Sequence, residues 1–449
     1  MSGSAPLTLV EVRRMLEGVV PPAMCTVGTD GMPHVNYLSQ AEYVDPEHVA
    51  LTFQFFNRSR DNVMATRRAA LSVDDPVSGA GVVLDLDYLR TETEGPIFER
   101  LRAKLAGIAS QTGMQKVFRL RGADIYRVRS IRRVPGRREL PSARMRCDLT
   151  AGTRMLSERM SHCEDLDSLL DALFDGLSGQ LLIQHAMVWL AEPERDCMVL
   201  LASRGYAPGS IGAEIALGEG LVGTAARVGV PIRVGHMSEM QTYSRAVRRR
   251  AHELGVEAAL SDELPLPGLG QPRSQLAVPL RVRGRVLGVL LVESLHDQFF
   301  SYDDEDALAI LAGQLAVAFT LMQPIGPPAA EARGEREPAA SGAVLCVRRF
   351  AQDNSVFLDD DYLIKGVAGA IFWKLARDHV ERGRCEFTTR ELRLVGDELR
   401  LPDVQDNVDV RLLLLQRRLV DRGAPVQIER TGRGRYRFAV QRPLALVEA

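Results

Sequence analysis

One segment near residue 330 limits how this chain can fold, because it cannot belong to a hydrophobic core. Residues 324–342 read PIGPPAAEARGEREPAASG and are nearly free of large apolar side chains. This mixture of proline, glycine and charge is typical of a flexible linker. A second break lies at 130–150, where SIRRVPGRRELPSARMRCDLT is basic and interrupted by two prolines. We therefore expect three folded units, at 1–135, 150–322 and 345–441. A linker at 323–343 joins the second unit to the third.

Length and composition agree with several soluble domains. At 449 residues the chain is too long for one ordinary core, and its formal net charge is −2. Any nucleic-acid surface must therefore be local. No apolar run approaches the length of a membrane span, and the amino terminus lacks the apolar core of a signal peptide. The six cysteines are scattered without a CxxC pair, so we expect a cytoplasmic protein without a zinc site.

A strand-to-helix corner in the first unit carries an unusual set of polar residues. The alternation in residues 49–56 predicts a half-buried strand, and Asp61 can cap a short helix from Asn62 to Arg68. Two arginines, a hydroxyl and an amide lie between them within the letters RSRDN. Such a corner can bind an anion, because the helix start and the guanidinium groups both attract one. The alternative is that these arginines are simply solvated, as loop arginines usually are.

The order of elements in the first unit resembles the split barrel of the pyridoxamine-5′-phosphate-oxidase family. The resemblance is carried by DGMPHV, VALTFQFFNRSRDN and AALSVDDP, within five or six expected strands of an antiparallel barrel. It implies a homodimer with FMN at the seam. It also implies that the corner holds the phosphate and that the preceding strand meets the ribityl chain or ring. The residues in the phosphate positions are Arg58, Ser59, Arg60 and Asn62. The residues in the positions that meet the ribityl chain or ring are Thr52 and Gln54.

The chemistry of this unit stays open at the sequence level. The substrate-binding segment of true pyridoxamine oxidases is missing, so synthesis of pyridoxal phosphate is not expected. A bound flavin could serve an FMN-dependent oxidoreductase or a redox sensor, since the reactivity belongs largely to the cofactor. Cys25, His34 and Tyr37 lie near the expected barrel mouth without partners that spacing supports. A third alternative is a scaffold whose barrel binds no cofactor.

The middle unit resembles a GAF domain. Residues 150–180 have helical apolar spacing and predict one long amphipathic helix, which could form a dimer seam or lie on its own sheet. The resemblance is carried by GEGLVGTAARVGVPIRV, SQLAVPLRVRGRVLGVLLVES and FSYDDEDALAILAGQLAVAF. It implies a sensor domain with a small-molecule pocket between sheet and helices, near residues 237–247. Trp189, Tyr206, Tyr243 and Arg273 could line it, but the sequence does not identify the ligand.

The last unit reads as three helices followed by a basic hairpin. An acidic start predicts a helix from Asp359 with Gly383 after its end, and Thr388 with Glu391 predicts a capping box. A third helix is expected to start at Asp406 or Asn407. PVQIERTGRGRYRF then predicts a hairpin. This order resembles the winged-helix effector domain of response regulators, through VDVRLLLLQRRL and RTGRGRYRF.

The resemblance implies that the third helix and the wing contact DNA. The matching residues are Arg411, Gln416, Arg417 and Arg418 on the helix, and Arg433, Arg435 and Arg437 on the wing. Two features favour a protein interface instead. Leu412 to Leu415 are consecutive, so at most half of them are expected to face the core of their own domain. Residues 345–442 also carry a net charge of only about +4 by count, less than a strongly basic DNA-binding domain.

These patterns together predict a multidomain α+β protein: a split barrel, a GAF α/β sandwich and a winged helix. The function expected is cytoplasmic signalling, with a small-molecule ligand at the GAF domain, FMN at the barrel, a homodimer, and possible contact with DNA. The rival is a flavin-dependent oxidoreductase regulated by its GAF domain.

Overall fold

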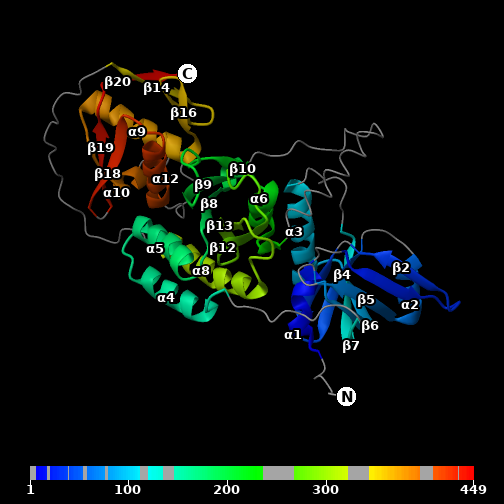
Figure 1. Ribbon diagram of the computed structural model, residues 1–449. Helices are drawn as coiled ribbons and strands as arrows, with labels where there is room; N and C mark the ends of the chain where they lie inside the picture. Colours follow the sequence, from blue (N-terminus) through cyan, green and yellow to red (C-terminus); the bar gives the residue numbers. More distant parts are fainter. Residues whose placement is uncertain are drawn as a thin grey trace. The chain divides into compact units, whose positions relative to one another are not determined.

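A computed structural model describes residues 7–17, 21–38, 40–53, 58–75, 79–111, 120–134, 146–235, 267–321, 343–394, 408–432 and 434–449. The predicted linker at 324–342 lies outside these residues. The chain forms two compact units. One comprises Met1–Asp148, Gly218–Val278 and Val292–Ala307, and the other comprises Leu149–Leu217, Pro279–Leu291 and Leu308–Ala449. The architecture is mixed α+β with largely antiparallel sheets, as the sequence predicts (Figure 1).

A seven-stranded antiparallel sheet dominates the amino-terminal part. Its strand order is β2-β1-β5-β6-β7-β4-β3, and it holds one or two more strands than the sequence predicts. The strands are β1 (Ala23–Val27), β2 (Pro33–Tyr37), β3 (Ala41–Asp45), β4 (His48–Phe53), β5 (Arg68–Asp74), β6 (Gly81–Glu92) and β7 (Gly122–Arg133). A short helix α1 (Leu9–Val12) and a 3-10 turn η1 (Arg13–Glu17) precede them, and α2 (Arg58–Thr66) and α3 (Pro96–Gln111) are inserted.

Strand β4 is buried on both faces, so the predicted half-buried strand is wrong. Val49 and Leu51 join the main apolar core, which includes the side chains of α1. Ala50, on the opposite face, packs in a second cluster with Phe98 and Leu101 of α3. The α3 helix therefore covers a face that the residue alternation assigned to solvent.

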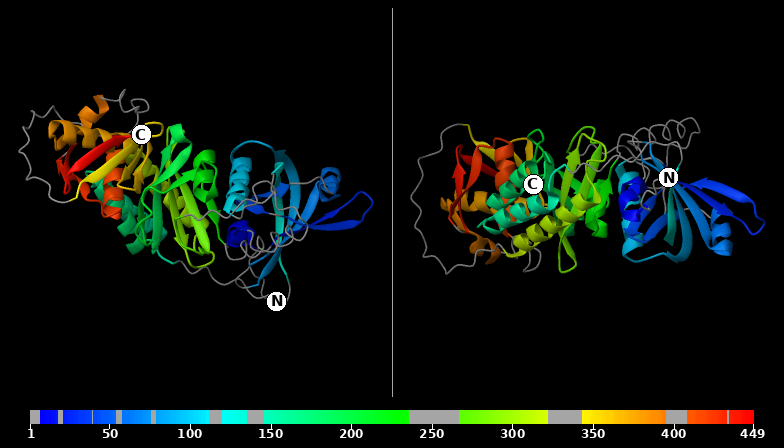
Figure 2. Two further views of the ribbon diagram at one scale, coloured as in Figure 1. Left: turned by 90° about the horizontal axis from the view of Figure 1, so that it is seen from above. Right: turned by 60° about the horizontal axis from the view of Figure 1, so that its bottom comes forward.

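The hairpin β1–β2 extends from the sheet in Figure 1 and in both views of Figure 2. Its turn contains Asp30 and Gly31, and Gly31 has a φ of 74°, which confirms the predicted turn. Glycine adopts this left-handed conformation without steric cost. The hairpin exposes Val35 and Tyr37 on β2, which is an edge strand of the sheet formed by the described residues.

The middle of the chain forms a six-stranded sheet with the order β10-β9-β8-β13-β12-β11. Its elements are α4 (Leu149–Ser161), α5 (Leu166–Gly179), β8 (His185–Glu192), η2 (Pro193–Arg195), β9 (Cys197–Arg204), β10 (Glu214–Ala216), α6 (Gly220–Val228), β11 (Ile232–Val234), β12 (Ser274–Val282), β13 (Arg285–Ser294) and α8 (Tyr302–Leu321). The single helix predicted over 150–180 is wrong. The chain breaks after Ser161, and Asp165 then caps α5 by accepting a hydrogen bond from the Ser168 N–H.

The described residues of the carboxy-terminal part form two small sheets and three helices. The strands β14 (Leu345–Phe350), β15 (Ser355–Leu358), β16 (Asp361–Ile364) and β20 (Leu444–Glu448) form a sheet with the order β16-β15-β14-β20. The strands β17 (Glu386–Thr388), β18 (Val426–Gly432) and β19 (Arg435–Val440) form another, with the order β17-β19-β18. The helices are α9 (Gly366–Arg382), α10 (Thr389–Leu394) and α12 (Val408–Asp421).

Several predicted boundaries in this part are confirmed and one is wrong. Gly383 ends α9 in the left-handed conformation, and the capping box of Thr388 and Glu391 is present in both directions. The predicted helix start at Asp359 is wrong. Asp359 begins the turn between β15 and β16, and the helix starts only at Gly366. Acidic residues favour a helix start and a tight turn alike, and here the turn formed.

Two glycines allow a test of the packing in the middle sheet. A Cβ at Gly288 would lie 2.2 Å from the carbonyl oxygen of Trp189, whereas a Cβ at Gly313 in α8 would meet nothing within 4 Å. We predict that Gly288→Ala lowers the free energy of unfolding by about 1–3 kcal/mol through overpacking. Gly313→Ala should raise it by about 0.5–1 kcal/mol through helix propensity. Denaturant unfolding of the two variants checks this, and an unchanged midpoint for Gly288→Ala would contradict it.

Candidate functional site: the junction of helix α12

The third helix of the carboxy-terminal part is covered on more than one side. Leu412, Leu413, Leu414 and Leu415 are all buried, with exposed fractions of 6% or less. Consecutive helical residues lie 100° apart, so one core cannot cover all four. Helix α12 packs on α9 and β18 of its own domain, and also on strand β9 of the middle sheet and on helix α5. The sequence predicts that at most half of these leucines face the core of their own domain. The other leucines are buried only because a second surface covers them.

A buried ion pair lies at this junction. Arg411 of α12 donates from Nη1 to Oε1 of Glu192, at the end of β8, over 2.6 Å. Both side chains are 4% exposed. Arg195 also approaches Glu192, with 3.7 Å between Nη1 and Oε2. Breaking such a pair leaves an uncompensated charge in a medium of low dielectric constant.

Further polar contacts surround the buried pair. Arg417 reaches Asp167 of α5 over 2.6 Å, and Arg430 of β18 reaches Asp165 over 2.6 Å. Arg418 donates to the carbonyl oxygen of Ile211. These three arginines therefore direct their charge or their donors toward α5 and the β9–β10 loop.

The pairing of Asp165 affects its titration. Burial raises the pKa of Asp165, but hydrogen bonds from the backbone and hydroxyl of Ser168 and the charge of Arg430 outweigh burial and leave the pKa below its ordinary value. The unfolded carboxylate binds its proton more readily, so the stabilisation by this contact is present near neutral pH and is lost as the pH falls through the folded pKa.

Comparison with known proteins identifies the domain that receives α12. A model of the GAF domain family matches residues 163–320. Residues 163–320 are a GAF domain. The match confirms the prediction for the middle of the chain, whereas the predicted limits at 150 and 322 stay a prediction. GAF domains typically bind small molecules, and this supports a signalling or regulatory role for the chain.

Two solved structures illustrate what parts of the chain are similar to. The GAF domain of an Acinetobacter phosphoenolpyruvate-protein phosphotransferase is 24% identical over 37% of this chain and 90% of its own, with a TM-score of 0.31. An FMN-binding protein from Syntrophomonas wolfei subsp. wolfei is 17% identical over 29% of this chain and 92% of its own, with a TM-score of 0.24. Comparison with curated proteins finds no match. Among the described residues, no helix is long and apolar enough to cross a membrane.

The helix residues predicted to contact DNA mostly face protein in this structure. Arg411 and Arg418 are each 3% exposed, and Arg417 is paired with Asp167 of the GAF domain. The Gln416 amide donates to the carbonyl oxygen of Ile428 in the hairpin. In this arrangement the arginine-bearing face of α12 is therefore not accessible to a duplex.

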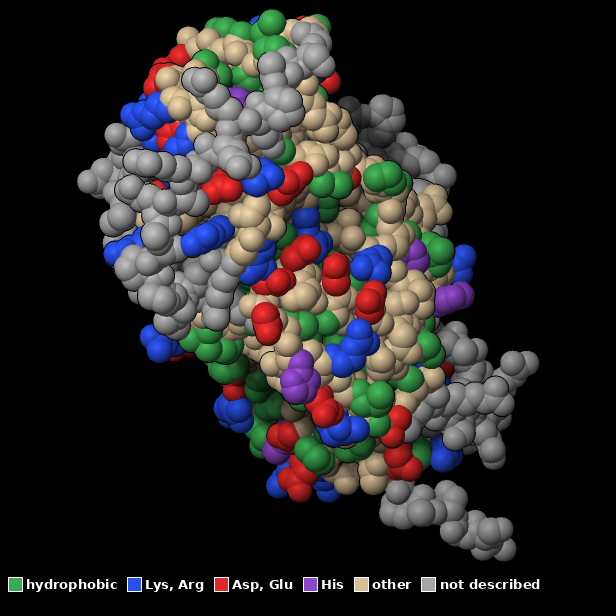
Figure 3. Space-filling model, turned by 90° about the vertical axis from the view of Figure 1, so that its left-hand side faces the viewer, with side chains coloured by type: hydrophobic (Ala, Val, Ile, Leu, Met, Phe, Trp, Pro, Cys, Tyr) green, Lys and Arg blue, Asp and Glu red, His purple; other side chains and the backbone are tan. Residues whose placement is uncertain are grey.

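The predicted wing residues are divided. Arg435 is exposed, Arg437 lies 3.6 Å from Glu386 in an exposed pair, and Arg433 lies outside the described residues. Among the described residues visible in Figure 3, the Lys and Arg side chains are interspersed with Asp and Glu and form no continuous basic surface. Only Arg435, of the described wing arginines, is thus exposed without a nearby acidic partner.

The residues predicted to hold FMN are brought together only in part. Helix α2 starts at Arg58, four residues earlier than predicted, which places Arg58, Ser59 and Arg60 in its first turn. Thr52 is buried, and its hydroxyl accepts from the Gln40 N–H and donates to the Gln40 carbonyl. Gln54 lies outside the described residues.

Three side chains of the predicted phosphate site differ in whether they are already hydrogen-bonded within the protein. Arg60 donates from Nη1 to both oxygens of Asp124 at 2.8 Å, and Asn62 donates to the Thr26 hydroxyl. Ser59 is 3% exposed, and its Oγ has no hydrogen-bond partner within the described residues. The helix start and Ser59 thus fit an anion, whereas Arg60 and Asn62 are engaged within the protein.

The last phosphate candidate, Arg58, is exposed. It forms a 3.0 Å pair with Asp30 in which both side chains are 54% exposed. An exposed pair of this kind contributes little stability, so Arg58 could exchange Asp30 for a phosphate at small cost. The fit to FMN therefore depends on Arg58, Ser59 and the α2 start.

The predicted ligand pocket of the GAF domain falls largely on residues 236–266, outside the described part. Trp189 of β8 is fully buried, and its Nε1 has no hydrogen-bond partner among the described residues. An indole N–H normally finds a partner when buried. Tyr206 packs edge-on against His185 with 5.5 Å between ring centroids, and Arg273 is exposed and near Asp297.

Sequence reasoning missed the acidic residues of the junction. Glu192, Asp165 and Asp167 lie more than 200 positions from their arginine partners. The one sequence pattern that pointed to the junction was the leucine run at 412–415. It indicates that a second surface covers the helix, but it does not indicate which part of the chain supplies that surface.

The buried pair allows a quantitative prediction. Glu192→Gln should destabilise the docked arrangement by about 3–5 kcal/mol, because in that arrangement Arg411 would be buried without a counter-charge. The double variant Glu192→Leu/Arg411→Met should recover most of that loss, since no charge is then buried. Denaturant unfolding measures both.

An exposed pair provides the control for that experiment. Arg437→Gln breaks the pair with Glu386 and should cost about 1 kcal/mol or less. Equal losses for Glu192→Gln and Arg437→Gln would show that the buried pair does not stabilise the junction.

Proposed function

We propose that this chain is a signalling protein in which the GAF domain controls a carboxy-terminal winged-helix output domain. The observation that supports this most is the docking of helix α12 on the GAF domain through Arg411 and Glu192, both buried. The GAF domain contacts the helix that a winged-helix domain uses for recognition. A change in the GAF domain therefore has a direct route to the output surface.

The order of elements supports the winged-helix assignment. Within the described residues, the helices α9, α10 and α12 precede the hairpin β18–β19, and β17 pairs with β19 to complete a small sheet. Phe372 of α9 packs edge-on against Phe438 of β19, with 5.7 Å between ring centroids. The helices and the hairpin therefore share one apolar core.

The mechanism follows from the accessibility of α12. In the docked arrangement Arg411, Arg417 and Arg418 face the GAF domain and are withdrawn from any duplex. A GAF ligand that binds the undocked arrangement more tightly would shift the population toward it. The arginines would then become available to DNA phosphates or bases.

This mechanism predicts that removing acidic residues of the GAF domain exposes a DNA-binding surface. Glu192→Gln/Asp167→Asn should raise the affinity of the full chain for duplex DNA by about tenfold or more, because it weakens the docked arrangement. Fluorescence anisotropy with a labelled duplex at several salt concentrations measures the affinity and its salt dependence.

Two matched variants make the result specific. Asp175→Asn removes an acidic residue of the same helix as Asp167 whose partner, Arg204, lies within the GAF domain, and it should leave DNA affinity unchanged. Adding Arg433→Ala/Arg435→Ala to the weakened background should abolish the gain. If the weakened variant gains no affinity, the output is not DNA binding. An output through contact with another protein would then be favoured by the leucine-rich α12.

For the amino-terminal sheet we propose a split barrel of the FMN-binding type. The support is the orphan hydroxyl of Ser59, buried at the start of α2 next to the exposed Arg58. The Ser59 hydroxyl and the free N–H groups of the helix start would hold the phosphate, and Arg58 would neutralise it. When bound, FMN would supply redox chemistry, in a sensor or in an oxidoreductase. The exposed apolar hairpin with Val35 and Tyr37 supports our proposal that the barrel is a homodimer.

The flavin proposal predicts a loss of cofactor in a defined variant. Arg58→Gln/Ser59→Ala should reduce the FMN content of the purified chain by about tenfold or more, because a charge-assisted contact and a buried hydrogen bond are both lost. Visible absorbance and the mass of the released cofactor measure the content. Arg68→Gln, at an exposed arginine 3.9 Å from Asp87, is the control. A chain that never carries flavin would contradict the proposal.

A further inference from the structure

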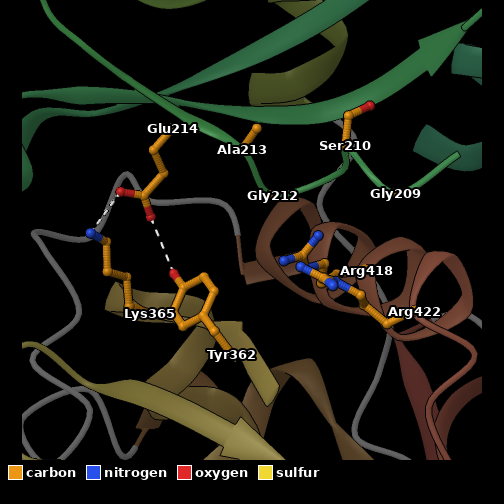
Figure 4. A pocket seen from close by; sticks show the side chains of 9 residues that line it. All are labelled: Gly209, Ser210, Gly212, Ala213, Glu214, Tyr362, Lys365, Arg418 and Arg422. Carbon is orange, nitrogen blue, oxygen red and sulfur yellow. Dashed lines mark hydrogen bonds and ion pairs between the residues drawn. The ribbon is translucent and has the colours of Figure 1, made fainter. Parts of the chain in front are cut away.

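A cavity lies between the β9–β10 loop of the GAF domain and the carboxy-terminal domain. Its volume is about 350 Å³. It is lined by the loop residues Gly209, Ser210, Gly212, Ala213 and Glu214, and by Tyr362, Lys365, Arg418 and Arg422 (Figure 4). Pockets of this size are large enough for a small organic molecule.

The lining carries more positive than negative charge. Three cationic side chains face one carboxylate, that of Glu214. This carboxylate is already engaged: Lys365 lies 2.9 Å from its Oε2, and Arg195 donates to the same oxygen over 2.6 Å. The Tyr362 hydroxyl also approaches Glu214, and Figure 4 shows both side chains on one side of the pocket. Glu214 therefore cannot also neutralise the two arginines.

Arg418 is buried with part of its guanidinium group unpaired. The side chain is 4% exposed, Nε donates to the carbonyl of Leu363 and Nη1 to the carbonyl of Ile211. Its Nη2 has no hydrogen bond within the described residues, and the nearest carboxylate oxygen, of Asp421, is 3.9 Å from Nη1. Burial lowers the pKa of Arg418, and the charge of Arg422 lowers it further. Buried guanidinium groups are normally matched by an anion.

Arg422 lies one helical turn after Arg418 and is exposed. Its side chain has no hydrogen bond or ion pair within the described residues, and Figure 4 shows it beside Arg418 beneath the glycine-containing loop. Like charges at this spacing destabilise a helix. An anion between the two guanidinium groups would remove that repulsion.

We infer that this cavity binds the phosphate group of a small molecule. Arg418 Nη2 and Arg422 would contact the phosphate oxygens, and Lys365 would add a third positive charge. Arginine suits this role because its planar donors match phosphate geometry. The remaining volume and the Tyr362 ring would accommodate an organic part. The site shares none of the residues predicted to line the GAF pocket and requires that the two domains be docked.

Because both domains line the cavity, a bound phosphate stabilises their docking. By linkage, docking and binding strengthen each other by the same factor. The ligand would therefore keep the arginine face of α12 covered.

Isothermal titration of the full chain at constant ionic strength tests the inference. The probes are AMP and inorganic phosphate, with adenosine as the uncharged control. We expect one site for AMP, about tenfold weaker in Arg422→Gln because one charge-assisted hydrogen bond is lost. Arg390→Gln removes an exposed arginine of α10 that has no ion pair within the described residues, and this variant should bind AMP like the unmodified chain. Tighter binding of AMP assigns the site to a phosphate ester, and equal binding assigns it to the free ion.

The inference is overturned if neither phosphate probe binds, if adenosine binds as well as AMP, or if Arg422→Gln binds like the unmodified chain. These outcomes are separate from those of the proposed function. A chain whose DNA affinity rises in Glu192→Gln/Asp167→Asn but which binds neither phosphate probe retains the function and lacks the site. A chain that binds AMP but shows no DNA response retains the site and lacks that output.

Discussion

The burial of Arg411 against Glu192 determines how the carboxy-terminal domain can be arranged on the GAF domain. A guanidinium and a carboxylate that are both 4% exposed have lost their hydration, and their mutual contact must compensate. A well-packed apolar pair could stabilise the same contact at least as well, so the advantage of the ion pair lies in specificity. The docked geometry satisfies both charges, and partial separation would leave them buried and unpaired.

The four leucines at 412–415 contribute buried apolar surface, which the ion pair does not. They supply apolar surface on both sides of α12, so undocking exposes leucine as well as charge. An exposed apolar patch of this kind is a typical protein-binding surface. Helix α12 is therefore suited to two partners, its own domain and one further surface, and the GAF domain is that surface here.

Local patterns predicted local structure well, and the long-range pairings could not be predicted. The capping box at Thr388, the left-handed Gly383 and the Asp30–Gly31 turn depend on neighbouring residues and are present. At Asp359, a turn and a helix start have the same local signal. The turn forms because β15 and β16 pair on either side of it. The partner of Arg60 is Asp124, 64 positions away, and no spacing rule indicates that pairing. The sequence thus predicted which residue types lie at the anion corner. It could not predict which of their side chains are engaged within the protein.

The junction and the cavity belong to one chain of alternating charges. It runs through Arg411, Glu192, Arg195, Glu214 and Lys365, with each member in contact with the next. In a medium of low dielectric constant such neighbours influence one another strongly, and a new anion near Lys365 competes with Glu214 for the same cation. Glu214 would then bind Arg195 more tightly and draw it away from Glu192. The charge balance at Arg411 would change without any movement of the backbone, so ligand binding in the cavity and the docking of α12 are coupled electrostatically as well as sterically.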